Sequence, residues 1–308
     1  MKLSKQDNLI RISFKYDQRL IELVRSLPNR QYQPKEKCWT IPVQGANGSL
    51  AKLVKAGFKI MPDLEEALRR EKELNKEIDD LKDDFETSLP LMPYQKAGAR
   101  FLDKIGSGLL GDSMGLGKTV QVLAVLEKNN SDKVLIFCPA VLKHQWRQEF
   151  GKFGLNWPIT VIEGNAGQRQ ELWQKDARVY IANYELLLRD FHFIDVRVWD
   201  YIVADEASKV SNPHAKQSKL VKKLRGKKKL ALTGSPISNR ANELWNVLDF
   251  IAGGSMGSYF GFVERYCLKN RWGGIVDYIN LEELQSKLKR YMIRRTKEQV
   301  LPDLPEKI

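Results

Sequence analysis

The stretch Leu109–Thr119, LLGDSMGLGKT, decides how the rest of the chain is interpreted. Gly115 and Gly117 leave room for successive backbone N–H groups to converge on a phosphate, because no side chain blocks the approach. Lys118 adds a positive charge at the β and γ phosphates, and the Thr119 hydroxyl is a ligand for Mg²⁺ where the next helix begins. The stretch therefore predicts a phosphate-binding loop between a buried strand and a helix.

This loop departs from the common pattern G-x-x-x-x-G-K-[ST], because Asp112 stands at the first glycine position. Its context favours a functional loop over a glycine-rich turn without a ligand. Leu109-Leu110-Gly111 is typical of the end of a short buried strand, and Val120, Leu123 and Leu126 give the following helix an apolar face. The loop residues predicted to contact a nucleotide are Asp112, Ser113, Met114, Gly115, Leu116, Gly117, Lys118 and Thr119.

A pair of acidic residues, Asp205 and Glu206, follows the apolar segment Tyr201–Ala204. Parallel sheets bind ligands at the carboxyl ends of their strands, and adjacent carboxylates there are costly unless a cation is near. We expect Asp205 to hold Mg²⁺ together with Thr119, and Glu206 to orient or deprotonate an attacking water. Lys118, Asp205 and Glu206 are thus the predicted catalytic residues. Without the upstream loop, the acid pair is also compatible with the cap of a helix.

Composition limits the class of protein. The chain has 308 residues and a formal net charge of +13, which suggests a polyanionic partner such as nucleic acid. Three separated cysteines and three histidines argue against a disulfide framework or a zinc site, so we expect an intracellular protein of the cytoplasm or nucleoid, or of a nucleus. The sequence has no run of about 18 apolar residues, so it does not indicate a membrane span. Met1–Leu20 carries charged residues throughout, so it does not indicate a secretory signal.

Three segments are predicted: a small α+β module at residues 1–62, a charged helical linker at 63–88, and a larger domain at 89–308. In the module, Tyr32, Lys37 and Trp39 interleave bases with aromatics, which is typical of nucleic-acid contact, although a small core also leaves aromatics half exposed. In the linker, Leu74, Ile78, Leu81 and Phe85 form one short apolar stripe. We expect this stripe to pack on its own chain and the protein to be a monomer.

From Leu91 onward, short apolar segments alternate with amphipathic segments of helical length. This alternation predicts an α/β fold with a parallel sheet covered by helices on both faces. The predicted strands are Val134–Cys138, Ile159–Ile162, Val179–Ala182, Tyr201–Ala204 and Leu230–Thr233.

Seven segments occur in an order that one family shares. They are Pro93-Tyr94-Gln95, Gly111–Thr119, Cys138-Pro139-Ala140 with Trp146, Asn183-Tyr184-Glu185, Asp205–Ser208, Thr233–Pro236, and Met292–Lys297 with Leu301–Pro305. Through them, Leu91–Ile308 resembles the first RecA-like lobe of the Swi/Snf family of superfamily-two helicase-like ATPases, whose members are double-stranded DNA translocases. The resemblance implies ATP and Mg²⁺ as cofactors, with Gln95 reading the adenine.

The resemblance also implies contacts with the DNA backbone. The residues to which it assigns them are Pro139, Lys143, Asn183, Tyr184, Ser235, Arg294 and Arg295. Two positions depart from the family pattern. Ser208 replaces the commoner histidine, which puts in doubt its usual link between hydrolysis and the next motif, and Ser235 replaces a threonine.

The opening module, through Phe14-x-Tyr16-Asp17, Tyr32, Lys37 and Trp39, is similar to the HepA-related (HARP) domain of annealing helicases that act on forked DNA. The combined interpretation is an ATP-dependent DNA translocase or helicase of the fork-remodelling or annealing type, with a role in DNA repair. A second RecA-like lobe, in cis or in trans, would complete the motor, so this chain alone is expected to be weakly active.

Two other classes stay open. One is a non-catalytic DNA-binding adaptor that uses the nucleotide pocket as a structural switch. The other is a small-molecule kinase, for which the sequence offers no acceptor site.

Overall fold

The computed structural model describes residues 1–6, 9–34, 36–43, 46–79, 84–234 and 241–300. The chain forms two compact units. Unit 1 comprises Met1–Asp79 and Arg240–Arg290, and unit 2 comprises Asp80–Asn239 and Tyr291–Ile308. Residues 240–290, assigned to the larger domain by sequence, thus lie in one compact unit with the N-terminal residues. The functional boundaries at residues 62 and 88 stay a prediction.

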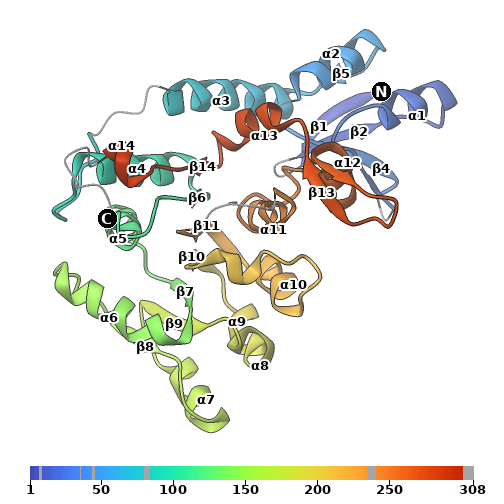
Figure 1. Cartoon of the computed structure of the whole chain (residues 1–308). Coiled ribbons are helices and arrows are strands. Elements are labelled where there is room, and N and C mark those ends of the chain that lie inside the picture. Colours follow the sequence, from blue (N-terminus) through green and yellow to red (C-terminus); the bar gives the residue numbers. More distant parts are fainter. Residues whose placement is uncertain (7–8, 35, 44–45, 80–83, 235–240, 301–308) are drawn as a thin grey trace. The chain divides into compact units, whose positions relative to one another are not determined.

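Unit 2 contains a seven-stranded sheet in which every pair of neighbouring strands is parallel (Figure 1). Its order is β14 (Met292–Ile293), β6 (Gly108–Leu110), β11 (Gly226–Leu232), β10 (Trp199–Ala204), β7 (Val134–Cys138), β9 (Val179–Asn183) and β8 (Ile159–Val161). Parallel neighbours require crossover connections, which the intervening helices supply. The predicted RecA-like α/β fold is confirmed.

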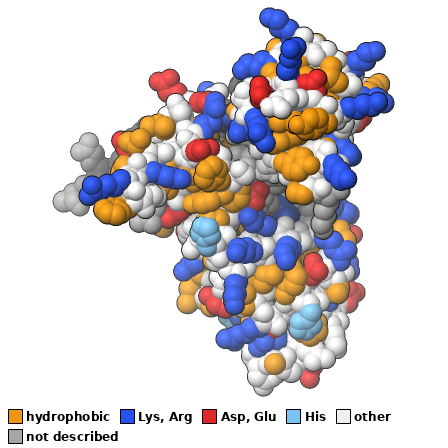
Figure 2. Space-filling view, turned by 90° about the vertical axis from the view of Figure 1, so that its right-hand side faces the viewer, with side chains coloured by type: hydrophobic (Ala, Val, Ile, Leu, Met, Phe, Trp, Pro, Cys, Tyr) orange, Lys and Arg blue, Asp and Glu red, His pale blue; other side chains and the backbone are white. Residues whose placement is uncertain are grey.

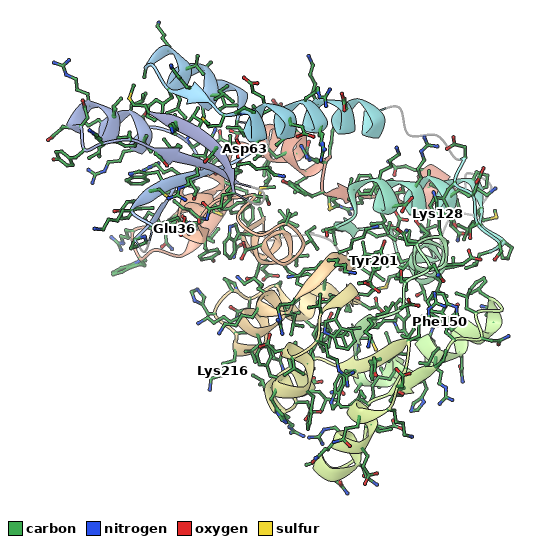
Figure 3. All side chains as sticks on the ribbon, turned by 180° about the vertical axis from the view of Figure 1, so that it is seen from behind. Glu36, Asp63, Lys128, Phe150, Tyr201 and Lys216 are labelled. Carbon is green, nitrogen blue, oxygen red and sulfur yellow. The ribbon has the colours of Figure 1, made fainter. Side chains whose placement is uncertain are left out.

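The helices of unit 2 flank this sheet. They are α4 (Pro93–Ile105), α5 (Lys118–Lys128), α6 (Lys143–Lys152), α7 (Ala166–Gln174), α8 (Leu186–Arg189), α9 (Phe191–Asp195), α10 (Lys216–Lys223) and α14 (Lys297–Val300), with 3₁₀ turns η1 (Ala140–Leu142) and η2 (Ala207–Val210). Every residue of α5 from Val120 to Leu126 is buried, so this helix lies inside the domain. Tyr201 of β10 and Phe150 of α6, both marked in Figure 3, also belong to the core.

Unit 1 contains a five-stranded sheet of order β3 (Gln31–Gln33), β4 (Cys38–Pro42), β2 (Leu9–Ser13), β1 (Lys2–Gln6) and β5 (Lys59–Ile60). All its neighbouring strands are antiparallel except β1 and β5. The helices are α1 (Gln18–Arg25), α2 (Asn47–Lys55), α3 (Pro62–Asp79), α11 (Ala241–Ile251), α12 (Tyr259–Tyr266) and α13 (Leu281–Leu288), and a hairpin joins β12 (Cys267–Lys269) to β13 (Ile275–Tyr278).

The helical linker predicted at residues 63–88 corresponds in part to α3. Leu64 at its start and Phe85 beyond its end are both buried. The side chains of Leu74, Ile78 and Leu81 lie outside the described residues, so the predicted stripe stays a prediction. Across the described part of the chain, no helix is both long and apolar enough to cross a membrane.

Candidate nucleotide site

The predicted phosphate loop lies between the end of β6 and the start of α5. Gly115 and Gly117 both have positive φ, at +84° and +69°, a region that side chains other than glycine rarely adopt. A Cβ added to Gly117 would also meet the Gln95 amide nitrogen at 2.4 Å. The chain therefore needs glycine where the loop turns into the helix. The first N–H groups of α5 lie at this turn and have no acceptor within the helix.

Lys118 reaches back across the loop. Its Nζ donates hydrogen bonds to the backbone oxygen of Asp112 at 2.8 Å and to that of Ser113 at 3.2 Å. Burial lowers the pKa of Lys118, while the charges of Asp112, Asp205 and Glu206 act in the opposite direction. These charges therefore lie within electrostatic range of the ammonium, so the loop and the acid pair, far apart in sequence, face one site.

The carboxyl end of β10 holds Asp205 between two donors. Its Oδ2 accepts from the indole N–H of Trp146 at 2.8 Å, and its Oδ1 accepts from the backbone N–H of Glu206 at 2.9 Å. Burial raises the pKa of Asp205, whereas both hydrogen bonds lower it, the neighbouring charge of Glu206 raises it and that of Lys118 lowers it. A carboxylate oriented in this way is a suitable ligand for a hard cation.

Glu206 has an unusual backbone. Its φ of +51° and ψ of +56° lie in the left-handed region, which costs a residue with a Cβ on the order of 1 kcal/mol. The Ser208 hydroxyl donates to Glu206 Oε1 at 2.7 Å. The serine that replaces the family's histidine thus holds the side chain of the predicted general base.

Two supporting residues were not predicted in these roles. Trp146, which the sequence analysis gives only as part of one of the seven family segments, orients Asp205 through its indole. Tyr184 donates its hydroxyl to the backbone oxygen of Asp205 at 2.7 Å, and its ring stacks on Phe137 at 5.7 Å. Only 2% of Tyr184 is exposed, and burial raises its pKa well above the usual value. The predicted DNA contact of Tyr184 stays a prediction.

Asp112 and Arg295 form a second, internal arrangement. Asp112 is fully buried, and the Arg295 guanidinium donates to both of its carboxylate oxygens, from Nε at 3.0 Å and from Nη2 at 2.5 Å. Gln121 donates to the same carboxylate at 3.1 Å. Both charged groups are satisfied within the protein. The Asp112 side chain thus faces Arg295, and the predicted nucleotide contact of the Asp112 loop position and DNA contact of Arg295 stay predictions.

Gln95 connects α4 to the phosphate loop. Its Oε1 accepts from the backbone N–H of Met92 at 2.9 Å, and its Nε2 donates to the backbone oxygen of Leu116 at 3.3 Å. The amide is buried at the edge of the loop. The predicted adenine contact stays a prediction. Met114 is exposed at the tip of the same loop, and Thr119 is half-buried in the first turn of α5.

The remaining predicted DNA contacts divide by exposure. Lys143 is 8% exposed and donates to the backbone oxygen of Ile162 at 2.8 Å, and its predicted contact with DNA stays a prediction. Pro139 and Asn183 are half-buried at the carboxyl ends of β7 and β9, and Arg294 is exposed. Ser235 lies outside the described residues. In unit 1, Lys37 is exposed, and Tyr32 packs on Trp39 with ring centres 5.1 Å apart.

The donor set fits a nucleotide with its cation. A half-buried ammonium, an oriented carboxylate, a hydroxyl at the start of α5 and a glycine turn together match the chemistry of a triphosphate and Mg²⁺. No cluster of three or more His, Cys, Asp or Glu side chains that could hold a metal by itself occurs among the described residues.

Comparison with known proteins gives one family. The SNF2-related domain matches residues 18–308. The putative ATP-dependent helicase/translocase YwqA of Bacillus subtilis is 34% identical over 71% of this chain and 25% of its own length, and the uncharacterized ATP-dependent helicase MG018 of Mycoplasma genitalium is 33% identical over 71% and 22%. The chain thus spans about a quarter of the length of these relatives.

Solved structures agree. The Sulfolobus solfataricus SWI2/SNF2 ATPase core in complex with double-stranded DNA matches with a TM-score of 0.63 and 34% identity, covering 73% of this chain and 49% of that one. The Sulfolobus solfataricus SWI2/SNF2 ATPase core domain matches with a TM-score of 0.58 and 33% identity, covering 71% of this chain and 46% of that one. The predicted resemblance to the Swi/Snf family is confirmed, and the similarity of the opening module to a HARP domain stays a prediction.

Proposed function

Because this chain belongs to the family of the SNF2-related domain, we propose that it forms the first lobe of an ATP-driven motor that moves on double-stranded DNA. The names of its relatives support an ATP-dependent helicase or translocase. The finer proposal is a motor of the fork-remodelling or annealing type, in which residues 1–62 are an accessory DNA-binding module.

The observation that supports this proposal most strongly is the convergence of Lys118 with Asp205 and Glu206. The loop follows β6 and the acid pair follows β10, two strands separated only by β11 in a parallel sheet, so their carboxyl ends lie at the same edge. The charges of both acids act on the Lys118 ammonium. A triphosphate lying between them would meet a cation on one side and a metal-binding carboxylate on the other.

Each residue then has a defined task. Lys118 binds the β and γ phosphate oxygens, exchanging the two backbone carbonyls that it now contacts for stronger, charged acceptors. Thr119 and Asp205 would hold Mg²⁺, which when bound neutralises charge on the transferred phosphoryl group. Trp146 keeps the Asp205 carboxylate oriented. Glu206, held by Ser208, accepts the proton of the attacking water.

DNA is proposed to lie along the exposed loops of unit 2, where Pro139, Asn183 and Arg294 are accessible, and to be bound through its backbone. Figure 2 shows one face of the molecule, on which many Lys and Arg side chains are spread among hydrophobic ones. The net charge of +13 supports a polyanionic partner. A second RecA-like lobe, in cis or in trans, is proposed as the partner that completes the site.

The test of the nucleotide site is the substitution Lys118→Ala. It removes the ammonium but leaves the glycine turn and the acid pair in place, so affinity for ATP with Mg²⁺ should fall by at least about tenfold, since a charged hydrogen bond contributes about 1.5–3 kcal/mol. Isothermal titration of the full chain with ATP and Mg²⁺ measures this change. Circular dichroism of the variant checks that the fold is kept.

Lys216→Ala is the matched control, because this lysine is exposed on α10 of the same unit (Figure 3). Its ATP affinity should equal that of the wild type. Equal ATP affinity in the Lys118 variant would contradict the proposed site. ATP binding without any DNA-stimulated phosphate release in the presence of a second lobe would favour the alternative function, a DNA-binding adaptor.

A further inference from the structure

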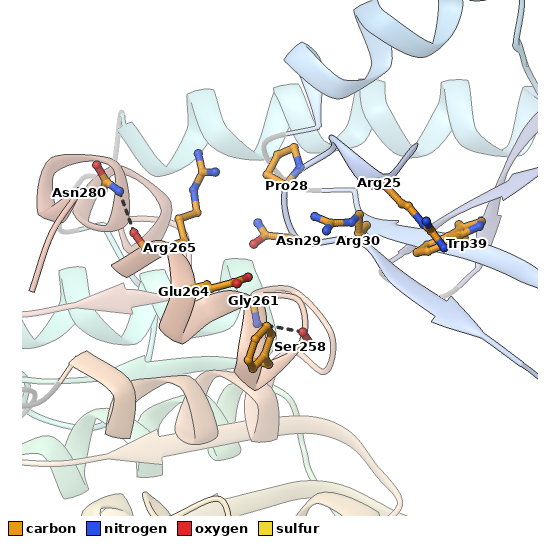
Figure 4. Close-up of a pocket in the computed structure, with 11 residues that line it drawn as sticks. Arg25, Pro28, Asn29, Arg30, Trp39, Ser258, Gly261, Glu264, Arg265 and Asn280 are labelled. Carbon is orange, nitrogen blue, oxygen red and sulfur yellow. Dashed lines mark hydrogen bonds between the residues drawn. The ribbon is translucent and has the colours of Figure 1, made fainter. Parts of the chain in front are cut away.

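Unit 1 contains a groove of about 670 Å³ (Figure 4). One wall comes from the end of α1 and from β4, and the other comes from α12 and the residues beside it. The lining residues on which the argument rests are Arg25, Asn29, Arg30, Trp39, Phe260 and Arg265. The two walls are separated by more than two hundred residues of sequence, so no sequence pattern indicates the groove.

The walls are held together by a close backbone approach. A Cβ on Gly257 would come within 2.8 Å of the Asn29 Cα, and Gly257 also has a φ of +70°. The backbone oxygen of Gly257 accepts from the Trp245 indole at 3.1 Å. A Cβ on Gly254 would likewise meet the Leu9 side chain at 3.0 Å. The N-terminal sheet thus packs directly on the segment that leads into α12.

The arginines that line the groove differ in whether an acidic side chain already pairs with them. Arg265 is paired with Glu283, which accepts from its Nε at 2.9 Å and from its Nη2 at 2.6 Å. Arg25 and Arg30 are exposed, and neither makes an ion pair among the described residues; Arg30 donates only to the backbone oxygen of Leu27 at 3.1 Å. These two guanidinium groups therefore remain able to bind an anion.

Aromatic rings stand on both walls. Trp39 is half-buried and packs against Tyr32, which is 49% exposed. On the opposite wall Phe260 is 66% exposed, and Lys269 lies over its ring with Nζ 5.4 Å from the centre. Both rings are thus accessible to a ligand in the groove. Their faces are platforms on which a planar base can stack.

Together these features match one ligand chemistry. A basic groove with aromatic rings on its walls binds a strand whose bases are unpaired, because phosphates contact the cations while bases stack on the rings. A duplex keeps its bases paired and stacked inside, so it could use the arginines but not the rings. Glu264 also lines the groove, and its negative charge disfavours a site that binds any polyanion by electrostatic attraction alone.

We propose that this groove of unit 1 binds single-stranded DNA, with phosphates at Arg25 and Arg30 and bases stacked on Trp39 and Phe260. The proposal rests on the DNA-directed function proposed above and adds the structure of the DNA that is bound. It also assigns α12 to the surface of the accessory DNA-binding module, which the sequence prediction confines to residues 1–62. A motor carrying such a groove would recognise DNA at which one strand is unpaired.

The test is fluorescence anisotropy of the full chain with a labelled oligo-dT strand, against a labelled duplex of the same length. Phe260→Ala should weaken binding of the single strand by about tenfold, since one stacked base contributes about 1–3 kcal/mol, and should leave duplex binding unchanged. Arg25→Glu should weaken single-strand binding and reduce the slope of log K against log salt by about 0.7, the value for one phosphate contact on a single strand.

The matched control is Lys52→Glu, the same charge reversal at an exposed residue of α2 that does not line the groove. It should change single-strand affinity far less than Arg25→Glu. Lys118→Ala should leave single-strand binding intact, which separates this proposal from the nucleotide site. Equal affinity of the wild type and Phe260→Ala for the single strand, or equal effects of Arg25→Glu and Lys52→Glu, would overturn the proposal.

Discussion

Replacing Arg295 by methionine tests whether this side chain stabilises the fold or is available to DNA. Asp112 is fully buried, and the Arg295 side chain is only 13% exposed. Methionine occupies a similar volume but donates no hydrogen bond. The Asp112 carboxylate would then stay buried with only the Gln121 amide and the backbone N–H of residue 295 as donors.

The magnitude follows from this geometry. Removing one partner of a buried ion pair costs about 3–5 kcal/mol, because the other charge is left uncompensated. The two remaining donors place the expected loss near the lower end, at about 3 kcal/mol. For a domain of about 150–250 residues, each kcal/mol shifts the thermal midpoint by about 2–4 °C, so unit 2 should melt about 6–12 °C lower.

Circular dichroism of the full chain during heating, without nucleotide or DNA, measures this shift. Arg294→Met is the control, because the neighbouring arginine is exposed and its loss should change stability by no more than about 0.5 kcal/mol. Combining Asp112→Asn with Arg295→Met removes the unpaired charge and should recover part of the loss. If Arg295→Met melts together with Arg294→Met, the pair does not stabilise the fold, and a DNA contact by Arg295 becomes the better interpretation.

Two further predictions concern carboxyl groups. Trp146→Phe removes the indole donor of Asp205 and so raises the pKa of that carboxyl further. As the pH falls, the variant should therefore lose its Mg²⁺-dependent affinity for ATP at a higher pH than the wild type does, which ATP titrations at a series of pH values measure. Coincident pH profiles would contradict the role assigned to Trp146. Burial alone would raise the pKa of Glu283, but hydrogen bonds from Arg265, Lys287 and Tyr266 lower it from 4.5 to about 2, so its contribution to the stability of unit 1 is lost as the pH falls through that window. Thermal midpoints measured from pH 7 downward should fall less steeply there for Glu283→Gln than for the wild type, and parallel curves would show that the ion pair is not the cause.

The sequence predicted the central strands of unit 2 because their burial on both faces makes them continuous apolar runs. Val134–Cys138 agrees residue for residue with β7. It did not predict β1, whose residues KLSKQ include only one buried side chain, Leu3. The strands β3 and β14, of three and two residues, are too short to show any periodicity. The place of β14 is determined by its pairing with β6, much earlier in the chain, which a local pattern does not contain, whereas β3 pairs with its sequence neighbour β4.

The candidate site shows the same limit. Lys118, Asp205 and Glu206 were predicted because each stands beside a recognisable turn or strand end. Trp146 was not assigned its role, because the indole meets Asp205 across 59 residues of sequence. Asp112 was placed in the loop correctly, but its side chain pairs with Arg295, 183 residues further along the chain. Pairwise contacts of this kind depend on the sheet order, which the motifs do not specify.

The charged groups of unit 2 differ in whether another protein group already neutralises them. Asp112 and Arg295 form an ion pair, whereas Lys118 and Asp205 do not pair with each other. The folded state favours neutral Lys118, whose lowered pKa gives stability present above its unfolded pKa and lost as the pH falls through the folded value. It favours protonated Asp205, whose raised pKa gives stability present below its unfolded pKa and lost as the pH rises through the folded value.

Burial opposes the charge of both groups. Arg295 and Asp112 compensate each other within the fold, whereas Lys118 and Asp205 contact carbonyls and N–H donors rather than one another. A ligand that offers phosphate oxygens to Lys118 and a cation to Asp205 neutralises both charges at once. Binding of nucleotide together with Mg²⁺ should therefore stabilise unit 2 more than either component alone, as expected for a site that binds both.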